Sequence, residues 1–156
     1  MGPGVIAAGN AAGLFAGLKN LERADVSELD VWGVECMRRM FEGCSSLKSL
    51  DLRGWDVSKV WDMRSMFEGC SSLLSLDLRG WDVLKVDWMD GMFEGCSSFL
   101  SLDLSSWDVS GVEDMSRMFR GCSSLRSLDL SGWDVSEVDT GAMFDGCESL
   151  DEVRWG

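Results

Sequence analysis

The sequence predicts an α/β fold, a curved solenoid of about six stacked units with a parallel sheet on its concave side and short helices opposite. Two observations favour this fold. The segment GCSSLKSLDLRGWDV begins at Gly43 and returns with few changes at Gly69, Gly95 and Gly121, so the chain repeats every 26 residues. Each repeat also has two halves with different apolar periods, one typical of a strand and one typical of a helix.

The first half of each repeat predicts a short strand. In LKSLDLRGWDV, which begins at Leu47, the apolar Leu50 and Leu52 alternate with polar residues. Because side chains alternate across a strand, we expect the leucines to point inward and the polar residues outward. The strands are expected to be parallel, one in each repeat. Their expected centres are Leu50–Leu52, Leu76–Leu78, Leu102–Leu104 and Leu128–Leu130.

The second half of each repeat predicts a short helix. In VWDMRSMFEGC, the apolar Met63, Met66, Phe67 and Cys70 stand at i, i+3, i+4 and i+7, which is one stripe of a helix. Acidic residues lie near its start, where the helix dipole favours them. The glycine before each cysteine, such as Gly69, stands where a left-handed C-terminal cap is expected.

Neither element is stable alone, so the units must stack to bury their apolar stripes. Helices are ~10 Å wide, whereas paired strands are ~4.8 Å apart. The helix side of the stack should therefore be longer than the strand side, which predicts a curved stack with the strands on its concave side. We expect a diverged N-terminal capping repeat followed by five repeats, the last of them incomplete. The predicted boundaries are 1–28 for the cap and 29–54, 55–80, 81–106, 107–132 and 133–156 for the repeats.

The repeat resembles a known family. Its pattern LxxLxLxxWxV is the signature of leucine-rich repeats, with Trp55 and its equivalents where most such repeats have Asn. The whole unit, SLDLSGWDVSEV followed by MF and a cysteine, resembles the BspA-type leucine-rich repeats of bacterial surface proteins. The resemblance is specific over 29–150 and weaker over 1–28. It implies a leucine-rich-repeat solenoid that acts in adhesion or recognition at the cell surface or outside the cell.

The composition excludes several classes of function. A formal net charge of −13 disfavours nucleic acid and anionic membranes as partners and fits a basic partner. The chain has no histidine, so it lacks the commonest general base and the commonest zinc ligand. Its carboxylates recur in every repeat, whereas a catalytic pair would occupy one place. We therefore predict no enzymatic activity and no cofactor, and no apolar run reaches transmembrane length.

Two sets of repeated residues are expected to be structural. Four cysteines close the apolar stripe and are expected to be buried free thiols; disulfides between neighbours are the alternative, disfavoured because their side chains run parallel. Cys36 stands at the polar position of Asp62 and is expected to be the reactive thiol. The repeated tryptophans are expected in the core, each followed by an aspartate that caps a turn. These columns are Cys44, Cys70, Cys96 and Cys122; Trp55, Trp81, Trp107 and Trp133; and Asp56, Asp82, Asp108 and Asp134.

A third column places aspartates on the concave face. Neighbours ~4.8 Å apart would repel by roughly 1 kcal/mol even in water, so the column needs relief. Solvent and nearby arginines, a weakly bound divalent cation, or a basic partner could supply it. We predict that this face binds a protein partner, or a glycan as the less favoured choice. The predicted contact residues are Asp51, Arg53, Asp77, Arg79, Asp103, Asp129, Leu74 and Leu100.

A second candidate surface comes from departures from the repeat. Trp32 and Leu84 replace the serine of other repeats, and Trp61 and Trp88 replace acidic residues. Together they predict an exposed apolar patch of the kind that marks partner sites, with neutral drift as the alternative. The sequence thus favours a non-catalytic recognition scaffold. The alternative is a purely structural repeat segment, part of a longer array or a designed consensus-like repeat, with no ligand of its own.

Overall fold

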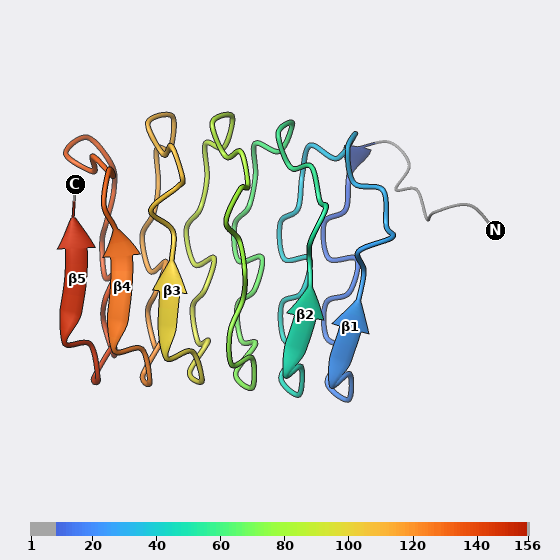
Figure 1. Cartoon of the computed structure of the whole chain (residues 1–156), viewed down its shortest axis with the longest axis horizontal. Coiled ribbons are helices and arrows are strands. Elements are labelled where there is room, and N and C mark those ends of the chain that lie inside the picture. Colours follow the sequence, from blue (N-terminus) through green and yellow to red (C-terminus); the bar gives the residue numbers. More distant parts are fainter. Residues whose placement is uncertain (1–8, 156) are drawn as a thin grey trace.

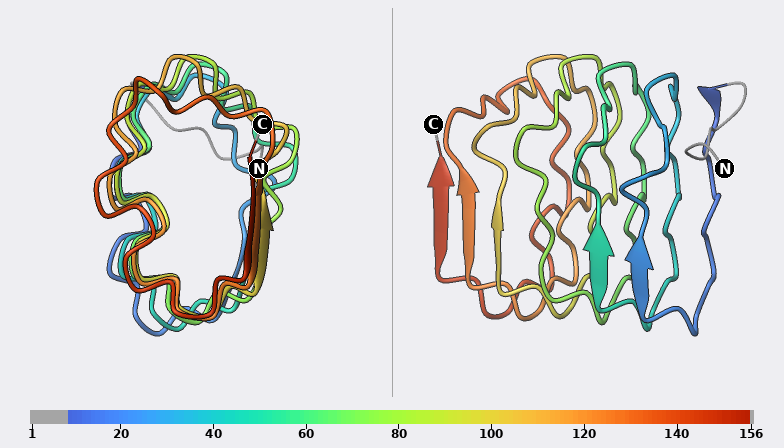
Figure 2. Two further views of the ribbon diagram at one scale, coloured as in Figure 1. Left: turned by 90° about the vertical axis from the view of Figure 1, so that its left-hand side faces the viewer. Right: turned by 45° about the vertical axis from the view of Figure 1, so that its right-hand side comes forward.

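The computed structural model describes residues 9–155, and within them the chain winds into a stack of coils. Viewed along the stack, the coils superimpose as one flattened loop with the strands on a straight side (Figure 2). From the side, the coils lie next to one another in a nearly straight row (Figure 1). The strands are β1 (Arg23–Asp25), β2 (Ser49–Asp51), β3 (Ser101–Asp103), β4 (Ser127–Leu130) and β5 (Glu152–Trp155).

The parallel strands expected near Leu50, Leu102 and Leu128 are confirmed. β1 pairs with β2, and β3, β4 and β5 pair in that order, all in parallel. Leu50 lies opposite Ala24 and Leu102 opposite Leu128, so the register advances by one repeat per strand. Alternation along these strands buries the leucines and turns Ser and Asp outward, as the period of two predicts.

The strand expected at Leu76–Leu78 is not formed, and this prediction is wrong. In the part of the chain that the structure describes, no backbone–backbone hydrogen bond reaches Ser75, Leu76 or Asp77. Leu76 is only half-buried, whereas Leu50 and Leu102 are buried. The sheet is therefore open on both sides of this segment, which stands apart between β2 and β3 in Figure 1.

The predicted helices are also wrong. Residues 9–155 contain no α-helix, and hence none of the length and apolar character that a membrane crossing requires. The second half of each repeat is instead a run of successive turns, each closed by an i+3 to i hydrogen bond. In one coil the N–H groups of Met66 and Cys70 donate to the carbonyls of Met63 and Phe67, at 3.3 and 3.0 Å. Such turns bury the same i, i+3, i+4, i+7 stripe that a helix would bury.

The turns are joined to their neighbours by a second hydrogen-bond ladder. The Phe67 N–H donates to the Met92 carbonyl at 2.9 Å, and the Phe93 N–H donates to the Met118 carbonyl at 2.9 Å. An α-helix would direct these groups along its own axis, so the ladder and a helix exclude each other. The turn side of the stack is therefore hydrogen-bonded from coil to coil, as paired strands are. The width difference that predicted curvature is absent, and the predicted concave face is a nearly straight one.

Two positions of the turn run need a left-handed backbone. The glycine before each column cysteine fills one of them; Gly95 has φ +76° and packs closely on Gly69, its predecessor in the stack. The second position holds ordinary residues in several coils, with φ +54° at Ser65 and +57° at Arg117. The left-handed glycine was expected, although it serves a turn rather than a helix cap.

Columns of aromatic rings fill the core. Phe67 and Phe93 are fully buried and stacked with their centroids 5.6 Å apart, and Trp81 stacks on Trp107 at 6.4 Å. The expected carbonyl partners of the indoles are confirmed in three coils, for example from Trp133 Nε1 to the Leu104 carbonyl at 3.0 Å. The aspartate after each tryptophan accepts the N–H two residues on, so its predicted turn-capping role is also confirmed.

The column cysteines are buried free thiols, as predicted. The thiol of Cys70 donates to the Phe41 carbonyl at 3.2 Å, and that of Cys96 donates to the Phe67 carbonyl at 3.2 Å. Burial raises the pKa of the Cys70 and Cys122 thiols to about 12 and that of Cys96 well above its usual range. The thiolate, which is the reactive form, is therefore suppressed throughout this column.

We expect alkylation of the native protein near pH 8 to modify Cys36 first. Cys36 is only half-buried, whereas Cys96 is fully buried and its pKa is raised by that burial. Mass spectrometry of peptides after timed iodoacetamide labelling measures the order. The same labelling in urea is the control, because there all six cysteines should react alike. Fast labelling of Cys96 in the folded protein would contradict its place in the core.

Candidate interaction surface

The outward side chains of the strands and of segment 75–79 form one continuous surface, which we call the strand face. It presents a column of serines, then a column of aspartates, then a column that changes from arginine to serine along the stack. The register places Asp51 beside Asp25 and Asp129 between Asp103 and Arg154. Its residues are Ser49, Asp51, Arg53, Ser75, Asp77, Arg79, Ser101, Asp103, Ser105, Ser127, Asp129 and Ser131.

The aspartates of this surface are fixed by their own coils. The carboxylate of Asp51 accepts the backbone N–H of Arg53 at 3.0 Å and a guanidinium N–H of the same residue at 2.6 Å. In the coils with serine, Asp103 accepts the N–H and the hydroxyl of Ser105, at 3.0 and 2.6 Å. Each carboxylate therefore caps a turn in its own coil, and in two coils an arginine also pairs with it, as Arg53 does with Asp51 and Arg79 with Asp77.

These contacts favour the charged carboxylate. The side-chain hydrogen bond from Arg53, followed by its backbone N–H, lowers the pKa of Asp51 to about 2. Side-chain hydrogen bonds from Arg79 and Ser131 likewise lower the pKa of Asp77 and of Asp129. Within residues 9–155 no group of three or more His, Cys, Asp or Glu side chains is arranged to hold a metal ion.

We expect Asp51 to titrate with a midpoint near 2 in the folded protein. Its folded pKa lies below the ordinary value of 3.8, so the contact stabilises the fold above about pH 4 and is lost as the pH falls toward 2. Carboxyl-detected NMR titration measures the midpoint, and Arg53→Ala should raise it. A midpoint near 3.8 in the parent protein would show that the Arg53 contact is not formed.

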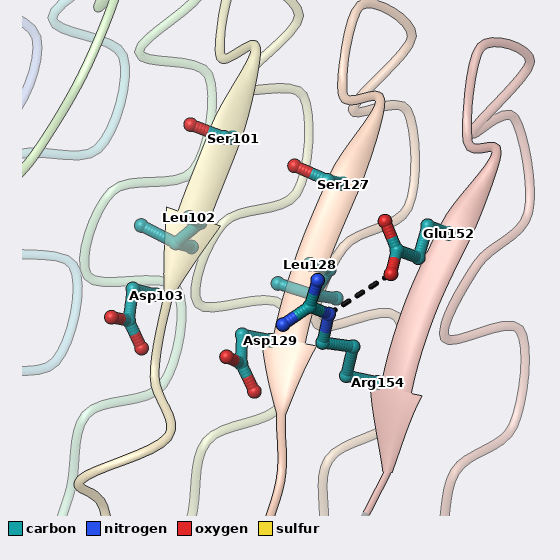
Figure 3. Close-up of a pocket in the computed structure, with 8 residues that line it drawn as sticks. All are labelled: Ser101, Leu102, Asp103, Ser127, Leu128, Asp129, Glu152 and Arg154. Carbon is teal, nitrogen blue, oxygen red and sulfur yellow. Dashed lines mark hydrogen bonds and ion pairs between the residues drawn. The ribbon is translucent and has the colours of Figure 1, made fainter.

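The strand face is hollowed between neighbouring coils. Three shallow hollows of about 210–280 Å³ lie in a row along it. The one over β3, β4 and β5 is shown in Figure 3, with Ser101 and Ser127 along one edge and Asp103 and Asp129 along the other. Arg154 donates to Glu152 at 2.9 Å, and its guanidinium reaches toward Asp129.

Two large apolar side chains are exposed beside this row. Leu74 is 59% exposed and Leu100 is 57% exposed, and each directly precedes a serine that lines a hollow. In the same column, Lys48 and Arg126 stand at either end of the pair. The structure thus places the predicted contact residues of the strand face on one surface, although that face is straight rather than concave.

The second predicted surface is less continuous. Trp32, Trp61 and Leu84 are exposed, but Trp88 is half-buried, with the Arg64 guanidinium 5.4 Å from its ring centroid. The Lys59 ammonium lies 3.4 Å from the centroid of the Trp32 ring and covers one of its faces. No stacked or edge-on ring pair joins these tryptophans in the described residues.

A buried ion pair beside Trp88 was not expected from the sequence. Asp62 is 1% exposed and accepts from Arg64 at 2.7 Å, and the Cys36 thiol lies 3.9 Å from the same carboxylate. In the next coil, burial raises the pKa of Asp90, whose Oδ1 has no hydrogen-bond partner in the structure. The Asp-x-Arg spacing, shared with Asp51 and Arg53, was the available signal for the first pair.

Comparison with known families decides the classification. Residues 7–76 and 72–154 both match the family described as Mycoplasma protein of unknown function, DUF285. The chain belongs to this family. No curated protein matches the sequence. The family description assigns no function, so the evidence for one comes from the structure.

Solved structures show the fold of this family member. The leucine-rich repeat protein of T. pallidum is similar over 97% of this chain and 62% of its own length, with 21% identity and a TM-score of 0.63. The chain thus has a leucine-rich-repeat-like fold and spans less than two thirds of that protein. A leucine-rich repeat protein from Bacteroides ovatus (18% identity, 98% of this chain, 59% of its own, TM-score 0.35) and the TLR13–ssRNA13 complex (13%, 94%, 34%, 0.25) are too distant to support any inference.

Proposed function

We propose that this protein is a non-catalytic recognition scaffold that binds a protein partner through the strand face. The row of hollows carries the proposal, because it lies beside exposed Leu74 and Leu100. Exposed apolar groups next to ordered polar groups are typical of partner sites. A stack of about six units, a BspA-type relationship and an adhesion role at the cell surface belong to the same proposal.

The variation along the stack supports binding. The third outward column changes from Arg53 and Arg79 to Ser105 and Ser131, and the column before the strands changes from Lys48 to leucine. The buried phenylalanine and tryptophan columns stay the same from coil to coil. A spacer would need the constant interior but not a differentiated surface.

A purely structural segment is the second candidate. It is favoured by the aspartates, each of which already caps a turn in its own coil and needs no external cation or partner. On this reading the exposed leucines have no function. The two candidates differ in whether the strand face binds anything.

Selection from a displayed library of 12-residue peptides separates the candidates. We expect binders whose affinity falls at least tenfold on Leu74→Ser/Leu100→Ser and is unchanged on Trp32→Ser/Leu84→Ser, a matched pair of exposed substitutions. The melting temperature of each variant checks its fold. If the peptides lose affinity only on Trp32→Ser/Leu84→Ser, the binding site lies on the other surface and the proposal is wrong. If no peptide binds, the structural segment is favoured.

A further inference from the structure

We propose that the partner presents a basic amphipathic α-helix, which lies across the strands along the axis of the stack. This inference rests on the proposed function of the strand face and specifies its ligand. It follows from three features of that face: the distance between coils, the width of the strip that lies between the exposed leucines and the aspartates, and the distribution of charge.

The distance between coils matches a helix better than a strand. Paired coils are ~4.8 Å apart, a helix advances ~5.4 Å per turn, and same-side residues of a strand are ~6.7 Å apart. Over three coil steps a helix drifts out of register by about 2 Å and a strand by about 6 Å. The segment at Ser75, Leu76 and Asp77 is not hydrogen-bonded to β2 or β3, so this part of the face is not fixed by strand pairing.

The strip is as wide as a helix. Leu100 and Asp103 are three residues apart along one coil, or about 10 Å in extended chain, and a helix with its side chains is about 10–12 Å across. Ser101 lies between them, with an outward side chain small enough to leave a shallow floor. The pair Leu74 and Asp77 brackets Ser75 in the same way one coil earlier.

Charge selects a basic helix and indicates where its cations lie. Arg53 and Arg79 already pair with their own aspartates, at 2.6 and 3.0 Å. Asp103 and Asp129 have serine two residues on instead, so no arginine of their own coils pairs with them, although the Arg154 guanidinium of β5 reaches toward Asp129. The whole chain carries a net charge of −13, which adds long-range attraction for a cation. The expected ligand has two apolar residues one turn apart and Lys or Arg one turn apart on the adjoining side.

Two synthetic peptides of identical composition test this inference. In the first, two leucines stand four residues apart and lysines lie one turn apart on the adjoining side, in an alanine and glutamine background. The second places the same residues in strict alternation. Fluorescence anisotropy of dye-labelled peptides should show the helical isomer binding at least tenfold more tightly, and a central proline should abolish its binding.

Matched variants locate the site. Affinity for the helical peptide should fall at least tenfold on Leu74→Ser/Leu100→Ser and on Asp103→Asn/Asp129→Asn, and should fall when salt is raised from 50 to 300 mM. Asparagine can still accept the turn N–H, so the second variant keeps the coil. Trp32→Ser/Leu84→Ser should bind normally. The alternating peptide could instead bind as tightly as the helical one and lose its affinity on Leu74→Ser/Leu100→Ser. That result would show that the strand face is a binding site but not one for a helix. If neither peptide responds to strand-face variants while selected binders do, the helix inference alone fails.

Discussion

Phe93→Ala is expected to lower the free energy of unfolding by about 3–5 kcal/mol. Phe93 is fully buried and stacks between Phe67 and Phe119, with centroid distances of 5.6 and 5.7 Å. Removing the ring leaves a cavity within a continuous aromatic column, and it removes contacts to two neighbouring coils at once. Each repeat is held only by its neighbours, so a central loss affects both halves of the stack.

Urea denaturation monitored by tryptophan fluorescence measures this loss. Leu100→Ala is the matched control, because Leu100 lies in the same repeat and is 57% exposed. We expect the control to change the free energy of unfolding by less than ~1 kcal/mol. A loss below ~1 kcal/mol for Phe93→Ala would show that the phenylalanine column is not part of the core.

Leu102→Ala is expected to cost about 2–5 kcal/mol, and Leu74→Ala less than ~1 kcal/mol. Leu102 is 5% exposed at the centre of β3, whereas Leu74 is 59% exposed. Leu76→Ala should fall between them, since Leu76 occupies the equivalent of Leu102 in the coil that is not paired.

Equal losses at positions 74 and 102 would mean that the strand phase is reversed. A one-residue shift of a strand exchanges its inner and outer faces, and the strand face would then be assigned to the wrong residues. Stability measurements on these variants therefore also test the surface on which the functional proposals rest.

The strands could be predicted because apolar and polar residues alternate along them, a pattern that fits a strand with one buried face and does not fit a helix. Leu50 and Leu52 alternate with Ser49 and Asp51, and a parallel stack is the arrangement that buries the leucines of every repeat. The missing pairing at residues 75–78 could not be foreseen, since LLSLDL in that repeat differs little from its neighbours.

The helices could not be excluded by pattern alone. An i, i+3, i+4, i+7 stripe is buried equally well by a helix and by successive turns, and the deciding quantity is where the backbone N–H groups donate. Ser65 and Arg117 adopt a left-handed backbone that their residue types do not signal. The recurrence of one glycine every 26 residues was the sequence feature that fits turns.

The sequence indicated which residues the strand face presents, but not how its aspartates are held. The Asp column was expected to be strained, because charge and spacing are visible in a sequence whereas the N–H two residues on is visible only in a structure. Arg53 and Arg79, which the sequence offered as relief, pair with Asp51 and Asp77, whereas Asp103 accepts neutral donors from Ser105. Exposure of Leu74 and Leu100 followed from their position beside the strand, and the structure agrees.

The stack depends on turns that hydrogen-bond from coil to coil, because these replace the wide packing of helices and keep the row of coils nearly straight. NMR scalar coupling across hydrogen bonds tests this directly in the central coil. We predict a coupling between the amide nitrogen of Phe67 and the carbonyl carbon of Met92, whose oxygen accepts that N–H at 2.9 Å. A coupling from Phe67 to the carbonyl carbon of Met63, four residues earlier, would show an α-helix and contradict the account.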